Sequence, residues 1–144
     1  MTVNKLSLQV FEVIERASSA KTKAERVKIL QENESWALKD LLRGTYDNKI
    51  VWQLPPGVPP YEPSQPHNHP TDLYKQHKQF TYFAKGGKGD SMVPFKRETM
   101  FIRMLEAVHP KEAELLIKMK DKKQLAKGIT KKLVQEVYPN LIRE

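Results

Sequence analysis

Seven of the ten prolines of the chain fall within sixteen residues, in the stretch LPPGVPPYEPSQPHNHP at positions 54–70. Proline fixes the backbone angle φ, lacks an amide hydrogen and keeps its predecessor out of the helical region. We therefore expect neither a helix nor a central strand here, but an extended polyproline II form. Because aromatic residues alternate with the prolines, the sequence favours a strap over the protein's own core, anchored by Trp52, Leu54 and Tyr61. The alternative is a proline-rich ligand for a partner, contacted through Trp52 and Tyr61.

On the N-terminal side of this segment, apolar residues recur at helical spacing. They predict helices over residues 6–19, 22–31 and 36–43. Thr22 and Glu25 have the spacing of a capping box, and Gly44 is well placed to end a helix. We expect residues 1–44 to form a small antiparallel layer of two or three helices, followed by the proline-rich segment over residues 45–70.

On the C-terminal side, residues 71–144 predict further helices. One runs from Thr71 or Asp72 to about Ala84, and a flexible loop follows at GGKGDS, residues 86–91. Residues 94–138 predict three short helices with tight connections, which together form a trihelical unit. The first of these carries an apolar stripe, with Lys96, Arg97 and Arg103 off it: Phe95, Met100, Phe101, Met104, Leu105 and Val108.

The length fits a single domain, and the spacing of the apolar residues makes its class mainly α. The chain has 144 residues and no cysteine, so disulfides and cysteine-ligated zinc are excluded. No apolar run is long enough to cross a membrane, and the N-terminus lacks the pattern of a signal peptide. We therefore expect a cytoplasmic protein without membrane contact.

Positive charge is the main surface signal. Lysine and arginine number 25 against 17 acidic residues, a formal net charge of +8. Two segments concentrate the excess: residues 75–103 hold seven basic and two acidic residues, and residues 118–132 hold seven lysines and one acid. Such clusters attract polyanions, because each cation that neutralises a phosphate releases a counterion. An ordinary solvated surface and an acidic protein partner are the alternatives.

Aromatic residues lie among the cations of the first segment, a pattern that suits single-stranded nucleic acid. Helical spacing turns Phe80 and Phe83 inward and leaves two tyrosines more open. The predicted nucleic-acid-binding residues are Tyr74, Lys75, Lys78, Tyr82, Lys85, Lys88, Lys118, Lys120, Lys122, Lys123, Lys127, Lys131 and Lys132. A helix-turn-helix reader, with Lys131, Lys132 and Gln135 facing DNA, is a weaker interpretation of the last helices.

Signals for catalysis or metal binding are weak. The loop at residues 86–91 lacks the spacing and the preceding strand of a nucleotide-binding motif, so a mobile connector is favoured. His67, His69, Asp72 and His77 are close in sequence, but the first two lie among prolines. The acidic residues are scattered, and Glu112 and Glu114 do not share a helix face. We therefore predict no catalytic residues, no cofactor, no metal site and no enzymatic activity.

Several stretches carry a family resemblance: WALKDLLRG at 36–44, LPPGVPPY at 54–61, KRETMF at 96–101, HPKEAE at 109–114, KDKK at 120–123 and GITKKLV at 128–134. Together they resemble a family of small uncharacterised proteins of large contractile-tailed bacteriophages, including cyanophages, over residues 20–142. The resemblance implies no activity and no site residues. It implies a context, the cytoplasm of an infected bacterium or the virion, in which replication, transcription, host takeover and assembly are the expected processes.

The sequence thus predicts a non-enzymatic accessory protein that contacts DNA or RNA, provided that the two lysine clusters converge on one surface of the fold. A protein-binding adaptor or inhibitor of a host or phage machine is the alternative. A minor virion or assembly component is the third hypothesis.

Overall fold

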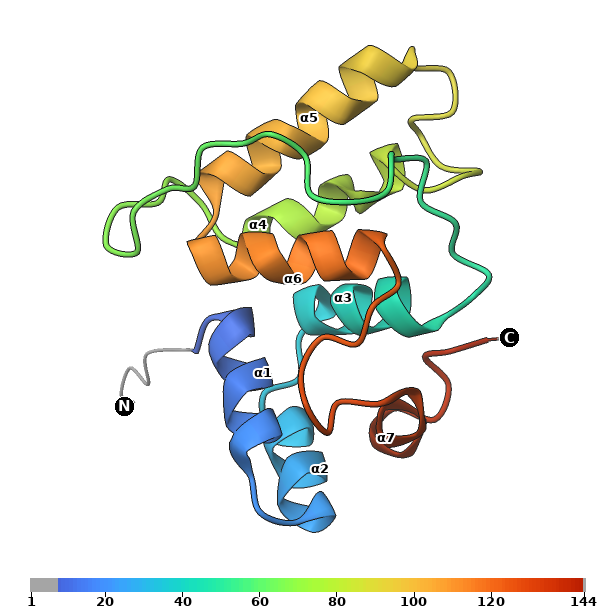
Figure 1. The fold of residues 1–144 in the computed structure, drawn as a ribbon. Coiled ribbons are helices and arrows are strands. Elements are labelled where there is room, and N and C mark those ends of the chain that lie inside the picture. Colours follow the sequence, from blue (N-terminus) through green and yellow to red (C-terminus); the bar gives the residue numbers. More distant parts are fainter. Residues whose placement is uncertain (1–7, 144) are drawn as a thin grey trace, which may run out of the picture.

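The computed structural model describes residues 8–143 and is mainly α-helical, as the sequence predicts (Figure 1). The described residues form no β-strand, only two isolated β-bridges. No helix among them is both long and apolar enough to span a bilayer. The helices are α1 (Val10–Ser19), α2 (Lys23–Glu32), α3 (Trp36–Tyr46), α4 (Leu73–Gln76), the 3-10 helix η1 (His77–Tyr82), α5 (Pro94–Ala107), α6 (Pro110–Lys120) and α7 (Lys131–Val137).

Helices α1 and α2 form a hairpin, and α7 packs against α2 at the same end of the molecule (Figure 1). The Tyr138 hydroxyl, just after α7, donates to the carbonyl of Leu30 in α2, 2.6 Å away. The prediction of a C-terminal trihelical unit is therefore wrong, because α5 packs on α6 at the opposite end while α7 joins α2. The predicted N-terminal layer is also incomplete, since α3 packs against α6 instead.

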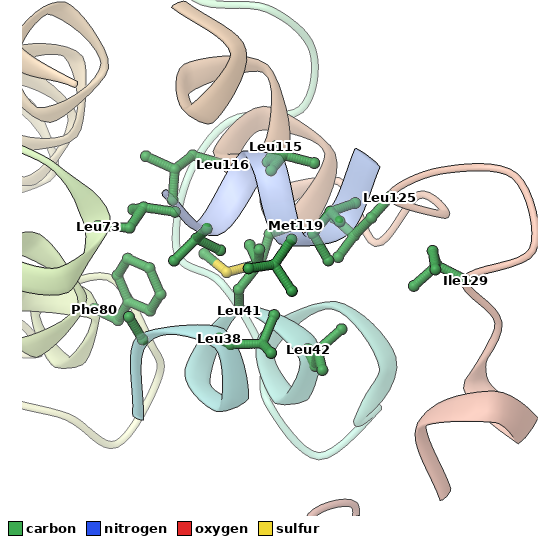
Figure 2. Packing of buried hydrophobic residues seen from close by; sticks show 14 of the residues in the cluster. Leu38, Leu41, Leu42, Leu73, Phe80, Leu115, Leu116, Met119, Leu125 and Ile129 are labelled. Atoms are coloured by element: carbon green, nitrogen blue, oxygen red, sulfur yellow. The ribbon is translucent and has the colours of Figure 1, made fainter. Parts of the chain in front are cut away.

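The centre of the core lies between α3 and α6 (Figure 2). Leu38, Leu41 and Leu42 of α3 face Leu116 and Met119 of α6, and all five are almost fully buried. Burying side chains of this size stabilises a fold by about 1.5–3 kcal/mol each. Figure 2 also shows that α4, η1 and the loop after α6 close this core on either side: Leu73, Phe80, Leu125 and Ile129.

The proline-rich segment is a strap across α5 and α6, as predicted. Trp52, Leu54 and Tyr61 are half-buried and pack against the core. Polar contacts hold the strap along its length: the Ser64 hydroxyl donates to the Val108 carbonyl at 2.6 Å, and the Glu62 amide donates to the Glu106 carboxylate at 2.9 Å. The strap therefore closes the protein's own core.

Local signals placed most helix ends correctly. Thr22 and Thr130 accept from amides of the first turns of α2 and α7, which are the expected N-caps. The start predicted for the first helix, at residue 6, lies outside the described residues. The helix predicted up to Ala84 is a single α-turn followed by the 3-10 helix η1, so that prediction is wrong beyond Gln76.

Gly44 does not end a helix, contrary to the prediction, because α3 continues to Tyr46. The absence of a side chain at Gly44 allows two neighbouring side chains to pack closely against α3. A Cβ on Gly44 would lie 2.5 Å from Cζ2 of Trp52 and 2.8 Å from Sδ of Met119. Glycine here lets the strap and α6 reach the backbone of α3, and the Trp52 indole donates to the Gly44 carbonyl at 2.8 Å.

Candidate functional site

The first lysine cluster is at the surface. Lys75 in α4, Lys78 in η1, and Lys85 and Lys88 in the following loop are all exposed. In α5, Lys96 and Arg103 are exposed as well. None of these six side chains has an ion pair with a described carboxylate, whereas Lys23, Lys39 and Lys111 each pair with a glutamate. The six are called the 75–103 cations below: Lys75, Lys78, Lys85, Lys88, Lys96 and Arg103.

Arg97 anchors the loop that carries two of these cations. The sequence placed Arg97 off the apolar stripe, but the side chain is buried and donates to three carbonyls: Gln53 at 2.9 Å, Gly89 at 3.0 Å and Met92 at 3.1 Å. The loop, which the sequence predicted to be a mobile connector, is thereby tied to both the strap and α5. The Lys88 amide also donates to Thr81 of η1. Lys85 and Lys88 are thus held between η1 and the start of α5.

An exposed aromatic residue lies beside the cations of α5. Phe95 is 77% exposed, although the sequence placed it in the apolar stripe. A shallow groove of about 420 Å³ runs along this face between Phe95, Lys96 and Arg103. The sequence analysis thus misplaced two residues, Phe95 in the apolar stripe and Arg97 outside it. The helical period could have corrected both, because steps of three or four residues back from buried Phe101 lead to Glu98 and Arg97, not to Phe95.

The two tyrosines of the predicted interface are only partly accessible. Both Tyr74 and Tyr82 are half-buried and pack against the core. The Tyr74 hydroxyl donates to the carbonyl of Leu8, and burial raises its pKa. Neither ring is as open as that of Phe95, so Phe95 is the better candidate for stacking on a base.

Three lysines of the second cluster hold the fold together. The Lys120 ammonium is buried and donates to the carbonyls of Pro55 and Gly57 in the strap, at 2.9 and 2.8 Å, and to Asp121. The Lys122 ammonium donates to the carbonyls of Gly44 and Asp47 at the end of α3, both at 2.8 Å. Lys118 donates to the Leu125 carbonyl at 3.3 Å. These three donors are used inside the molecule.

Lys122 also has an unusual backbone conformation. Its φ of 57° lies in the left-handed region, which at the end of a helix is usually occupied by glycine. The amides of Lys122 and Lys123 donate to the carbonyls of Met119 and Lys118, which closes α6. Burial lowers the pKa of the Lys122 ammonium, while the charge of Asp47 opposes this effect. The positive charge at the C-terminus of α3 suits the helix dipole.

The lysines at the start of α7 lie far from the first cluster. Lys123, Lys127 and Lys132 are exposed, and Lys131 is half-buried at the start of α7. Figure 1 shows α7 and α5 at opposite ends of the molecule, with α3 and α6 between them. With three lysines bonded internally and those of α7 at the far end, the second cluster as a whole does not converge with the first into one surface (Figure 1). The same separation removes the basis for the helix-turn-helix interpretation, since α7 packs on α2.

The histidines near the strap are dispersed. The His69 ring lies 5.4 Å edge-on from that of His109, which stacks on Phe11 at 4.1 Å. His77 turns instead to Asp40 of α3. Within residues 8–143, no three histidine or carboxylate side chains are grouped as a metal site would require. The predicted partner contacts Trp52 and Tyr61 are engaged with the core, which leaves the strap without a freely presented aromatic side chain.

Comparison with known proteins identifies the family. The model described as "Family of unknown function (DUF6433)" matches residues 13–127, and the chain belongs to this family. No curated protein matches the sequence. The matched segment runs from α1 to the loop after α6, and it contains the 75–103 cations, Phe95 and the whole strap.

Proposed function

We propose that this member of the DUF6433 family is a non-enzymatic accessory protein that contacts nucleic acid through the 75–103 cations. The observation that supports it most directly is the state of these six side chains, which are exposed and have no ion pair with a described carboxylate. Within residues 75–103 only Asp90 and Glu98 are acidic. The Asp90 carboxylate accepts from the amide of Gly86, so the loop uses it internally. Seven basic residues against these two carboxylates leave residues 75–103 with a formal net charge of +5.

Phe95 favours single strands over duplexes. Bases of a single strand stack on exposed aromatic rings, and each such contact contributes about 1–3 kcal/mol. Lys96 is the next residue along α5, and Arg103 borders the same groove. An exposed aromatic ring that shares one groove with two cations therefore suits an unpaired base and its neighbouring phosphates. The phage context implied by the sequence resemblance belongs to this proposal, with replication, transcription or host takeover as the process.

Fluorescence anisotropy tests the proposal, with labelled single-stranded DNA, single-stranded RNA and duplex DNA, over about 50–300 mM salt. We expect tighter binding to single strands and affinity that falls steeply as salt rises. The triple variant Lys85→Gln, Lys88→Gln, Lys96→Gln is expected to lose most of the binding. Its matched control is Lys123→Gln, Lys127→Gln, Lys132→Gln, which removes the same charge from exposed lysines elsewhere and is expected to bind nearly as well.

Two results would contradict the proposal. One is the absence of binding to any nucleic acid at low salt. The other is an equal loss in both triple variants, which would mean that only total charge matters. Phe95→Ser adds a third test, because it leaves the charge unchanged and is expected to weaken binding to single strands more than to duplexes.

A protein partner is the second candidate. Val93 and Phe95, two residues apart at the start of α5, are 56% and 77% exposed, and exposed apolar side chains that form a patch are typical of protein interfaces. An adaptor or inhibitor would bind its partner through this patch. A virion component, the third hypothesis, would be detected by mass spectrometry of purified phage particles. Pull-down from nuclease-treated bacterial lysate separates the two candidates, because nuclease removes any partner that is held through nucleic acid. A protein that survives nuclease and is lost in Phe95→Ser, but is kept in the triple lysine variant, supports the adaptor.

A further inference from the structure

A second depression of about 420 Å³ lies between α3, η1 and the strap. Its apolar lining includes Ile50 and Trp52 of the segment 45–70 and Phe80 of η1. The rings of Trp52 and Phe80 meet edge to face, with centroids 6.0 Å apart. The indole nitrogen of Trp52 donates to the Gly44 carbonyl, which fixes the orientation of the ring. The cleft therefore has a rigid aromatic wall, and its volume lies in the range of pockets that bind small organic ligands.

Polar groups from α3 and η1 border the same cleft. Nδ1 of His77 lies 2.6 Å from Oδ2 of Asp40, across 37 positions of sequence. His77 is 11% exposed at its side chain and Asp40 is 39% exposed. Because a carboxylate only accepts hydrogen bonds, this contact places the proton on Nδ1 and leaves Nε2 of the imidazole for a ligand. Asp40 thereby orients the ring.

Two cations complete the lining. Arg43 follows Asp40 by one helical turn, and Lys78 follows His77. The guanidinium of Arg43 forms an ion pair with Asp47, with Nε 3.6 Å from Oδ2, which is too long for a hydrogen bond. Asp47 already accepts from the amides of Lys49 and Arg143. The guanidinium thus retains donors for an oxyanion, and its fork geometry matches phosphate.

We propose that this cleft binds a nucleoside monophosphate, either free or at the end of a strand. The base lies against Trp52 and Phe80, the phosphate is bound by Arg43 and Lys78, and His77 hydrogen-bonds the sugar or the base. The inference does not rest on the proposed function, because Lys78 is the only residue common to the cleft and the 75–103 cations. Charge complementarity and the aromatic wall together distinguish this ligand from an uncharged aromatic compound or a bare anion.

The two tryptophans of the chain make the cleft observable. Trp36 is 71% exposed and lies outside the cleft, so the variant Trp36→Phe leaves Trp52 as the sole indole. In this background we expect saturable quenching of tryptophan fluorescence by AMP, GMP, CMP or UMP. The corresponding nucleosides and inorganic phosphate are expected to bind at least tenfold more weakly. A 5′-phosphorylated short oligonucleotide distinguishes the end of a strand from the free nucleotide.

Arg43→Met and Lys78→Met are each expected to weaken nucleotide binding about tenfold, a change equivalent to 1.4 kcal/mol. Lys49→Met is the matched control, an exposed cation nearby in sequence that does not line the cleft, and it is expected to change nothing. Thermal unfolding confirms that each variant is folded. No saturable signal up to about 5 mM nucleotide would overturn the inference. Equal affinity for nucleoside and nucleotide would do so too.

One variant distinguishes nucleotide binding in the cleft from oligonucleotide binding by the 75–103 cations. The triple variant Lys85→Gln, Lys88→Gln, Lys96→Gln leaves the cleft intact, so its nucleotide binding is expected to be unchanged even where its oligonucleotide binding is lost. Nucleotide binding that fell in this triple variant to the same extent would mean that the signal arises outside the cleft, and would overturn the assignment.

Discussion

The carboxylate of Glu112 accepts a hydrogen bond from the backbone amide of Leu73, 3.1 Å away, although the two residues are 39 positions apart. Its second oxygen lies 3.4 Å from the amide of Phe11. Leu73 begins α4, Phe11 lies in the first turn of α1, and Glu112 itself lies in the first turn of α6. One fully buried side chain therefore joins the N-termini of three helices, where negative charge suits the helix dipoles. Glu114, two residues on, is exposed, so the two carboxylates lie on different faces of α6, as predicted.

Glu112 is expected to make stability depend on pH. Burial raises its pKa from 4.5 to about 7, although the two amides and His69 act in the opposite direction. The folded state then holds the proton more tightly than the unfolded state does. This contribution to the free energy of unfolding is fully present below about pH 4.5 and is lost as the pH rises through 7. The whole effect amounts to roughly 3 kcal/mol at most.

Denaturant unfolding of Glu112→Gln between about pH 5 and 8 measures this contribution. Glutamine does not ionise, so the variant is expected to lose less stability than the parent protein over that range. Glu114→Gln, on the exposed face of the same helix, is the control and should keep the parent's dependence. Identical pH profiles for the parent and Glu112→Gln would show that the buried carboxyl does not titrate in this range.

Arg97 is expected to be essential for the stability of the strap and the loop before α5. Arg97→Met removes three hydrogen bonds from a charged donor and leaves the carbonyls of Gln53, Gly89 and Met92 without that partner. Hydrogen bonds to charged groups contribute about 1.5–3 kcal/mol each, and they are not additive, so we expect a loss of about 2–4 kcal/mol. Arg103→Met, exposed on the same helix, should change stability by less than about 0.5 kcal/mol. Similar unfolding midpoints for the two variants would refute this role.

Lys120 is expected to stabilise the strap, whereas Lys123, three residues away, is expected to contribute nothing to stability. Lys120→Met deprives the carbonyls of Pro55 and Gly57 of their donor and leaves Asp121 without its ion pair, which should cost about 2–3 kcal/mol. Amide hydrogen exchange is expected to increase around Gly57, whose amide donates to Asp121. Lys123→Met should leave both measurements unchanged. If the two variants exchanged alike, the ammonium of Lys120 would not be what holds the strap.

Gly44→Ala is expected to destabilise the protein even though alanine favours helices by about 1 kcal/mol. The added Cβ would meet the Trp52 ring at 2.5 Å, and that ring is held by its bond to the Gly44 carbonyl. Met119 is flexible and can move, but the indole cannot move without losing its hydrogen bond. In the Trp36→Phe background, a shift in the emission of Trp52 should accompany a loss of about 1–3 kcal/mol. A more stable variant with unchanged Trp52 emission would show that the Trp52 ring does not pack this closely on Gly44.

Local interactions explain why parts of the structure could be read from the sequence. Thr22 and Thr130 cap helices through amides three residues away, and prolines exclude helix wherever they cluster. The helical period also indicates which leucines of α3 are buried. Trp36, at the start of the same helix, is exposed instead, and the ammonium of Lys39 lies 4.9 Å from the centroid of its ring. These features depend on residues within about one turn of each other, so no knowledge of distant segments is needed.

The sequence by itself determined the mainly helical class, most helix boundaries and the strap, because each follows from short-range hydrogen bonding or from the geometry of proline. Only the tertiary structure decided which cations are free. A lysine stem is long enough to reach solvent or to turn inward, and the choice depends on whether a distant segment offers carbonyls without partners. The strap offers them to Lys120 and the end of α3 offers them to Lys122, whereas no acceptor within residues 8–143 reaches the ammonium groups of Lys85 or Lys88. The pairing of His77 with Asp40 likewise required α3 and η1 to pack together.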